Sequence, residues 1–151
     1  MRRPEDPIPS SPLWVVLVDD RDARRDIMHQ VVGGDGVRAS VVADAHSRAS
    51  ALLAVGQHHP DAVVVDIRMP VAEGLRTVLD LRQAFPGLGI VVCSFDLDPA
   101  TVRDALVAGA NTCLAKPASR QHLLAALEGA CSEARTAEGS ISHVAMVAGA
   151  G

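Results

Sequence analysis

Aromatic residues are almost absent from this chain. Its 151 residues include one Trp, two Phe and no Tyr, 2% in all, whereas apolar residues together make up 48%. A core must therefore be built from Val, Leu, Ile and Ala. That composition is typical of a β-branched parallel sheet covered by Ala/Leu-rich helices, and the length is that of one domain.

The sequence also lacks the long apolar run of a membrane protein and the basic run of a nucleic-acid-binding protein. No apolar stretch approaches the roughly 18 residues that a membrane span needs. The net charge is −4, without a cluster of Lys or Arg. We therefore expect neither membrane association nor direct nucleic-acid binding. The start, MRRPEDPIPSSP, has no apolar segment behind its arginines, so no signal peptide is expected.

Disulfide and soft-metal chemistry are not expected either. The three cysteines, Cys93, Cys113 and Cys131, form no CxxC pair, and the six histidines show no ligand spacing. Reduced thiols in a cytoplasmic protein fit this pattern best.

Proline and small polar residues gather at the two ends. Four prolines in the first 12 residues predict a disordered arm over residues 1–12. Small and polar residues dominate at the other end, which predicts a flexible tail over 135–151. The globular part is therefore expected over residues 13–134.

Short apolar runs alternate with amphipathic segments five times between these ends. The runs predict five β-strands, at Leu13–Val18, Arg38–Val42, Ala62–Val65, Ile90–Cys93 and Thr112–Ala115. Strands that alternate with helices predict an α/β fold, a parallel sheet with helices on both faces. The order of the strands is not visible in the periodicity.

Capping residues mark where the helices begin and end. Helix starts are predicted by the capping side chains of Asp22, Ser47, Asp98 and Ser119. Glycines predict helix ends at Gly33-Gly34, Gly56 and Gly109. In the first helix, the spacing predicts that the inward-facing side chains are Ala23, Ile27 and Val31.

Polar side chains follow four of the five predicted strands. They are Asp19-Asp20, Asp66, Ser94 and Lys116. Functional groups of open parallel sheets lie beyond the carboxyl ends of the strands, so we expect this set to converge. An Asp at one strand end alone is more often a turn former or a helix cap.

Three converging carboxylates need a cation, because each pair repels by about 4 kcal/mol at 4 Å and an effective dielectric near 20. Oxygen ligands alone favour Mg²⁺, or Mn²⁺ in its place. A lysine and a hydroxyl beside a metal-loaded carboxylate can receive a phosphoryl group, and the remaining carboxylate can act as its nucleophile.

With these residues in this order, the sequence resembles the response-regulator receiver domain of two-component signalling. The matching segments are Asp19-Asp20, the run DIRMPVAEG from Asp66 to Gly74, Ser94 and Lys116-Pro117. The resemblance covers roughly Leu13 to Ala134. It implies a flavodoxin-like, doubly wound sheet with the strand order 2-1-3-4-5.

The resemblance also implies a role for each site residue. Asp66 accepts a phosphoryl group from a histidine kinase or a phosphotransfer protein, Lys116 pairs with its oxygens, and Ser94 moves to bind it. Mg²⁺ is held by Asp20, Asp66 and the backbone carbonyl of Arg68, with Asp19 acting through water. The chain is thus expected to be a switch rather than an enzyme, apart from self-catalysed phosphoryl transfer and loss. At the rim, Arg68 and Asp96 are expected to pair across the phosphoryl group.

The sequence departs from the family pattern at several positions. Ser94 replaces the common Thr, and Ala72-Glu73 replace the common Met-Asp. Cys113 stands three residues before the lysine, where an aromatic switch residue is frequent. Nothing in residues 136–151 resembles an output domain, so we expect an isolated receiver, or one cut before its output domain. Homodimerisation or partner binding is expected through the face formed by Pro99–Ala108, Thr112–Ala115 and Ser119–Ala134.

Two other functions compete with the phosphorylatable switch. A pseudo-receiver would use the fold as a docking module without accepting phosphate, but it has no use for a repulsive carboxylate cluster. A small hydrolase with an aspartyl-phosphate intermediate would need a cap domain, for which the chain is short. It would also need a DxD motif that begins at the first residue after the first strand, where the chain reads Asp19-Asp20-Arg21.

Overall fold

The structure of the protein, a computed structural model, describes residues 12–33, 38–68 and 70–149. Five strands alternate with five helices, as predicted. The strands are β1 (Leu13–Val18), β2 (Ala39–Ala45), β3 (Ala62–Val65), β4 (Gly89–Ser94) and β5 (Thr112–Ala115). The helices are α1 (Asp22–Val32), α2 (Arg48–His58), α3 (Val71–Ala84), α4 (Pro99–Ala108) and α5 (Arg120–Gly149). All of the predicted arm except Pro12 lies outside the described residues.

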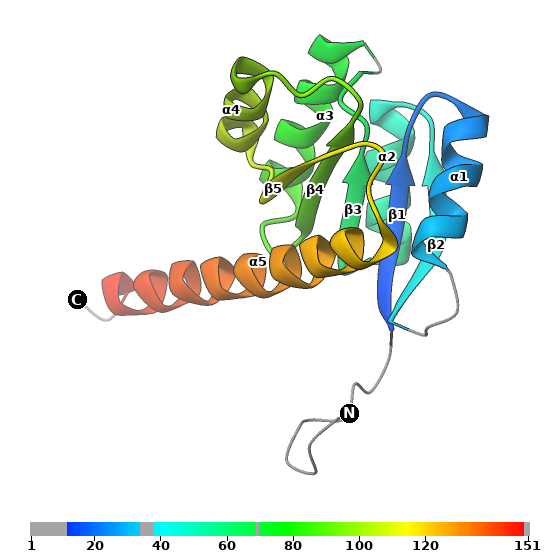
Figure 1. Ribbon diagram of the computed structural model, residues 1–151. Coiled ribbons are helices and arrows are strands. Elements are labelled where there is room, and N and C mark those ends of the chain that lie inside the picture. Colours follow the sequence, from blue (N-terminus) through cyan, green and yellow to red (C-terminus); the bar gives the residue numbers. More distant parts are fainter. Residues whose placement is uncertain (1–11, 34–37, 69, 150–151) are drawn as a thin grey trace.

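The strands form one parallel sheet in the order β2-β1-β3-β4-β5 (Figure 1). This confirms the doubly wound, flavodoxin-like α/β fold. Strand order reverses between β1 and β3, so the ends of these two strands lie beside the crevice where such sheets bind ligands.

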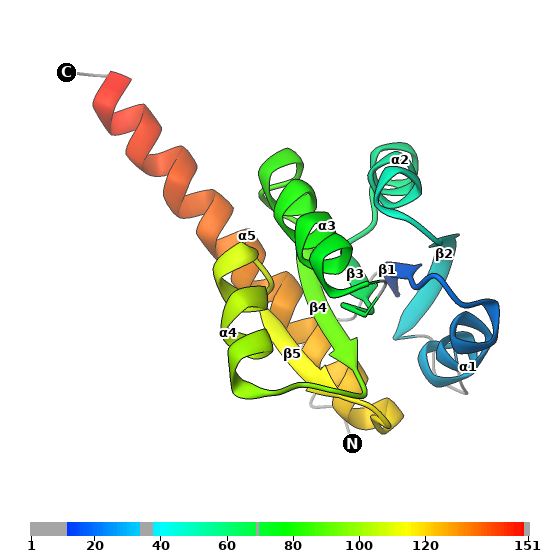
Figure 2. The ribbon, with the colours of Figure 1, turned by 90° about the horizontal axis from the view of Figure 1, so that it is seen from above.

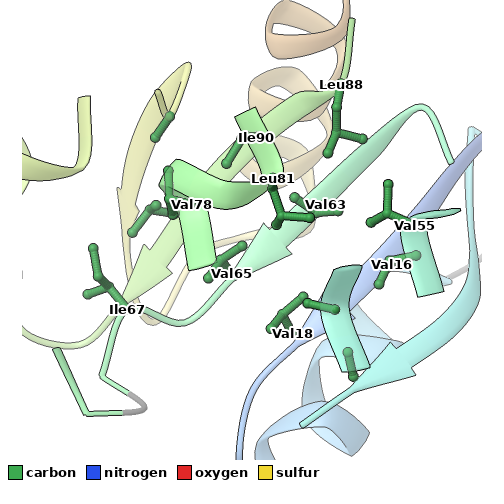
Figure 3. Close-up of a cluster of buried hydrophobic side chains, with 14 of the residues drawn as sticks. Val16, Val18, Val55, Val63, Val65, Ile67, Val78, Leu81, Leu88 and Ile90 are labelled. Carbon is green, nitrogen blue, oxygen red and sulfur yellow. The ribbon is translucent and has the colours of Figure 1, made fainter. Parts of the chain in front are cut away.

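Helices cover both faces of the sheet (Figure 2). One core cluster packs α2, α3 and α4 against the sheet; Figure 3 shows part of it, with Val63, Val65 and Ile90 facing Val78 and Leu81. The other cluster packs α1 and α5 against the opposite face. β3 and β4 are buried along their whole length, as expected for strands covered on both sides.

Helix α1 is rotated relative to the sequence prediction. Its buried residues are Met28 and Val32, whereas Ile27 is 61% exposed. The two apolar stripes are adjacent on the helix surface, so spacing alone does not choose between them. Arg24 lies four residues before Met28 and shares its stripe. The observed rotation therefore turns Arg24 towards the sheet.

Most predicted helix ends are confirmed, and a few shift. Ser47 and Asp98 cap α2 and α4 through side-chain hydrogen bonds, and the Ser119 hydroxyl accepts from the third residue of α5. Asp22 does not cap α1, because it is already the first helical residue. α2 passes Gly56 and ends at His58, since the following His59 adopts the left-handed conformation (φ 47°) that closes the helix.

Helix α5 continues to Gly149, whereas the sequence predicts its end near residue 134 and a flexible tail beyond. Figure 1 shows the last part of this helix running past the sheet. The segment after Ala134 contains no proline and several alanines, so helix propensity is sufficient to extend a helix that the core has already nucleated. The helix therefore extends beyond the end that the sequence predicts, and the predicted flexibility of residues 135–151 stays a prediction.

Candidate functional site

Three of the predicted site residues meet at the carboxyl edge of the sheet. Asp19 follows β1, Asp66 follows β3 and Lys116 follows β5. The Lys116 ammonium lies 3.3 Å from Asp66 Oδ2 and 3.5 Å from Asp19 Oδ2. All three side chains are at most 8% exposed. The predicted convergence is therefore confirmed for these residues.

Asp66 is held from both of its carboxylate oxygens. Oδ1 accepts the backbone N–H of Arg68 at 2.9 Å, and Oδ2 accepts from the Arg24 guanidinium at 3.0 Å as well as from Lys116. The carboxylate is only 3% exposed. A buried carboxylate with several charge-assisted hydrogen bonds keeps its charge and a fixed orientation.

The two neighbouring carboxyls differ in their preference for a proton. Burial raises the pKa of Asp19, and although the Arg21 N–H acts against this, the charge of Asp66 raises it further. Burial also raises the pKa of Asp66, but the Arg68 N–H, Lys116 and a hydrogen bond from Asp19 outweigh it and hold the pKa below its ordinary value. A shared proton therefore goes to Asp19, and Asp66 stays ionised.

Ser94 is fully buried at the end of β4, and its hydroxyl has no hydrogen-bond partner among the described residues. A buried hydroxyl without a partner costs about 1–3 kcal/mol. Beneath the site, a cavity of ≈ 10 Å³ is lined by residues that include Asp19, Asp66, Cys93 and Lys116. The Cys93 thiol stays protonated, because burial raises its pKa to about 11.

Asp20 is exposed, unlike its neighbour Asp19. Among the described residues, no three His, Cys, Asp or Glu side chains are grouped so as to hold a metal ion. The predicted ligand set of Asp19, Asp20, Asp66 and Arg68 stays a prediction. The buried residues of the set carry the oxygen ligands that a hard cation prefers, because two carboxylates share one lysine beside a small cavity.

Arg24 is a site residue that the sequence prediction missed. Its guanidinium carbon lies 5.8 Å from the centroid of the Phe95 ring, and the Lys116 ammonium lies 5.6 Å from the same centroid. Both cations thus touch Asp66 and Phe95. The signal was present in the sequence, since Arg24 shares a helical stripe with Met28 and Val32, but the prediction placed the adjacent stripe of Ala23, Ile27 and Val31 inward.

The remaining predicted residues lie around this centre. The Arg68 side chain forms an ion pair with Asp96, as predicted. Cys113 is half-buried on β5 and packs at the margin of the α2–α4 core cluster. Burial raises the pKa of its thiol, which therefore stays neutral and fills space where an aromatic ring is frequent in the family.

The fold and this edge define a flavodoxin-like α/β protein with a buried, cation-supported acidic pair at its topological switch point. The model of the response regulator receiver domain matches residues 15–128. The chain belongs to this family, the receiver domains of two-component systems.

The chain is similar to proteins of several bacteria. The chain is 30% identical to the chemotaxis protein CheY of Bacillus subtilis over 113 residues, which span 75% of this chain and 92% of that protein. It is 31% identical to protein-glutamate methylesterase/protein-glutamine glutaminase 3 of Hahella chejuensis over 110 residues, 72% of this chain but only 31% of that enzyme. Some relatives are thus far longer than the part they share with this chain.

A solved receiver has the same architecture. The signal receiver domain of the response regulator NarL from Mycobacterium tuberculosis superposes with a TM-score of 0.73 at 27% identity, covering 81% of this chain and 98% of that one. The comparisons give no support to the pseudo-receiver alternative. Within the described ranges, no helix has both the length and the apolar character to cross a membrane.

Proposed function

We propose that this chain is a phosphorylatable receiver in which Asp66 accepts a phosphoryl group from a histidine kinase or a phosphotransfer protein. The observation that carries this proposal is the buried Asp66 carboxylate, which Lys116 and the Arg68 N–H keep ionised. An ionised carboxylate held in a fixed orientation at the topological switch point can act as a nucleophile.

The chemistry follows from these contacts. An Asp66 oxygen donates an electron pair to phosphorus, and the bond from phosphorus to the donor's nitrogen or oxygen breaks with its electron pair moving to the donor. Lys116 neutralises charge on the transferred oxygens. The unpaired hydroxyl of Ser94 supplies a donor that finds its partner only when a phosphoryl group arrives, which makes it the moving part of the switch.

A divalent ion completes this site in our proposal. Asp20, Asp66 and the Arg68 carbonyl would hold Mg²⁺, or Mn²⁺ in its place, with Asp19 behind them. When bound, the ion supplies charge neutralisation for the phosphoryl oxygens. The residues themselves keep Asp66 ionised, exclude most water by burial and leave Asp19 to take up any proton.

Phosphorylation adds about −1.5 to −2 charges at pH 7. The side chains of Ser94 and Lys116 can move towards the phosphoryl group and bind its oxygens. These residues lead into α4 and α5, so we propose that the switch changes the α4–β5–α5 face. Leu106 and Val107 of α4 are 45% and 82% exposed there, which supports binding of a partner or of a second copy. We infer a protein partner rather than nucleic acid, because the chain is acidic.

Mass spectrometry after incubation with acetyl phosphate tests the proposal. The expected result is a gain of one phosphoryl group that requires Mg²⁺ and is lost in Asp66→Asn. Phosphorylation that persists unchanged in EDTA contradicts the metal assignment. Turnover of an external phosphoester would instead support a hydrolase, and an unmodified wild-type chain would contradict the function itself.

A further inference from the structure

One oxygen of Asp66 carries two cationic partners. Lys116 and Arg24 both contact Oδ2, at 3.3 Å and 3.0 Å. Lys116 belongs to the expected set of site residues, and it also contacts Asp19. Arg24 comes from the first turns of α1, and Asp66 is the carboxylate with which it pairs. One lysine already compensates part of this charge, so the second cation calls for an explanation.

Arg24 is held in this position from a second side. Its guanidinium lies against the Phe95 ring, whose other cationic contact is Lys116. A cation over the face of an aromatic ring is attracted by the negative charge of that face. The contact with Phe95 therefore favours the conformation in which Arg24 reaches Asp66. Arg24 and Lys116 thus share both the Phe95 ring and the Asp66 carboxylate.

Both oxygens of Asp66 already accept hydrogen bonds, and Oδ2 accepts more of them than Oδ1. Oδ1 accepts the Arg68 N–H, and Oδ2 accepts both cations. A divalent ion that takes Oδ2 as a ligand must displace one of the two cations, and an ion on Oδ1 is repelled by both of them. Lys116 is 8% exposed and tied to Asp19, whereas the Arg24 side chain is 25% exposed and can turn to solvent. Arg24 is therefore the partner that leaves at the lowest cost.

We infer that Arg24 is the resident counter-cation of Asp66 in the unphosphorylated protein and competes with the divalent ion for that carboxylate. This inference rests on the proposed function. Arg24 is thus a positioning residue that weakens metal binding, so that the site becomes competent only when the ion displaces the guanidinium. Met28 and Val32 of α1 are buried in the core. Their packing fixes the rotation of the helix and so limits the positions that the Arg24 guanidinium can reach.

The experiment is a titration of the whole chain with MgCl₂ in the absence of any phosphodonor, followed by the amide resonances of Asp66 and Arg68. Arg24→Gln removes the competing contact, and Arg21→Gln is the matched control. Arg21 is exposed on the same helix end, and its contribution to Asp19 comes from the backbone, which the substitution keeps. Both variants lower the charge near the site equally.

We expect Arg24→Gln to bind Mg²⁺ about tenfold more tightly than Arg21→Gln, because a charge-assisted hydrogen bond no longer has to be broken. Arg24→Lys, which keeps a cation on a shorter stem, should fall between wild type and Arg24→Gln. This conservative variant also serves if Arg24→Gln does not fold, which the same spectra reveal.

Equal Mg²⁺ affinities for Arg24→Gln and Arg21→Gln overturn the inference and leave the proposed metal site standing. Mg²⁺ binding that weakens in both Arg24 variants also overturns it, since the guanidinium would then assist the ion. Absence of binding in every protein overturns the inference together with the metal part of the proposed function.

Discussion

The Arg68 guanidinium forms an ion pair with the Asp96 carboxylate, which joins the loop after β3 to the loop after β4. Arg68 lies two residues beyond Asp66, and Asp96 lies two beyond Ser94. The pair therefore lies beside the two residues that we expect to hold a phosphoryl group. Both side chains are well exposed, at 45% and 71%, so the pair is bounded in strength to about 1 kcal/mol.

The first prediction concerns the lifetime of the phosphoryl group. If the Arg68–Asp96 pair restricts in-line water, Arg68→Ala should shorten the lifetime about fivefold, which is what about 1 kcal/mol gives in a rate. Asp96→Ala should act similarly, and the double variant little more than either single one. Loss of label from the phosphoprotein measures this. Single-variant effects that multiply, or that are absent, contradict action as a pair.

Much of the fold could be predicted because its signals are local. Unbroken apolar runs rich in valine marked β1 and β3. Ser47 and Asp98 marked helix starts with the cap bonds that the structure contains. The convergence of Asp19, Asp66 and Lys116 followed from parallel strands, which all end at one edge. The strand order came only from family resemblance, because periodicity carries no information about which strands are neighbours.

The missed features depend on contacts that are distant in sequence. The rotation of α1 depends on packing against distant parts of the chain and brings Arg24 to Asp66, 42 residues away. The two adjacent apolar stripes gave no local preference. Arg82 was missed for the same reason. Its guanidinium bonds to carbonyls of Leu88 and Gly109, which no local pattern brings together. The extent of α5 was missed because small polar residues suggested a loop although the segment has no helix breaker such as proline.

A second prediction follows from the buried Ser94 hydroxyl, which has no hydrogen-bond partner in the part of the chain that the structure describes. Ser94→Ala should leave the free energy of unfolding unchanged or raise it by about 1 kcal/mol, because it removes a buried polar group without breaking a bond. The same variant should lose the phosphorylation-dependent response. Urea unfolding measures the first effect and partner or dimer formation the second. Thr77→Ala is the contrasting control. The Thr77 hydroxyl donates to the backbone carbonyl of Glu73, and its loss should lower the free energy of unfolding.

The third prediction locates the response. Amide exchange of the beryllofluoride complex, compared with the free protein, should change in α4, in β5 and in the part of α5 that packs on the sheet. The physical reason is that Ser94 and Lys116 lie at the ends of β4 and β5, directly before the segments that lead to these helices. Asp66→Asn should show no change under the same conditions. Changes confined to α1 and α2 would contradict the placement of the output face.

The fourth prediction concerns the Arg82 clamp between α3 and the α4–β5 turn. The guanidinium donates to the carbonyls of Pro86, Leu88 and Gly109 and to the side chain of Asn111. Arg82→Ala should lower the free energy of unfolding by about 3 kcal/mol, because it leaves several partly buried acceptors unpaired.

A lysine cannot reproduce the planar fork of Arg82, so Arg82→Lys should recover less than half of that loss. Arg76→Ala, at an exposed position of the same helix, should change stability by no more than about 0.5 kcal/mol. Equal losses of stability in Arg82→Ala and Arg76→Ala would show that the hydrogen bonds of the Arg82 guanidinium do not stabilise the fold. Thermal and urea unfolding of the four proteins decide the question.

The last prediction uses the opposite pKa shifts of Asp19 and Asp66. The folded pKa of Asp66 is lowered, so its ionisation contributes stability above its unfolded pKa, and that contribution is lost as the pH falls through the folded value. The folded pKa of Asp19 is raised, so its ionisation costs stability once the pH exceeds the unfolded value.

Asn substitutions at these two positions should therefore have opposite effects at pH 7. Asp19→Asn should raise the free energy of unfolding by about 1 kcal/mol, because it removes a buried charge that repels Asp66. Asp66→Asn should lower it by a similar amount, because Lys116 and Arg24 lose their anion.

The contrast between the two variants should shrink as the pH falls below about 4, where both carboxyls become protonated in the unfolded chain and Asp19 is already neutral in the fold. Urea unfolding of both variants between pH 3 and pH 7 is the measurement. Changes in the free energy of unfolding that have the same sign at pH 7, or a contrast that does not change with pH, would contradict the prediction. They would mean that the pKa values of the two carboxyls are not shifted in opposite directions.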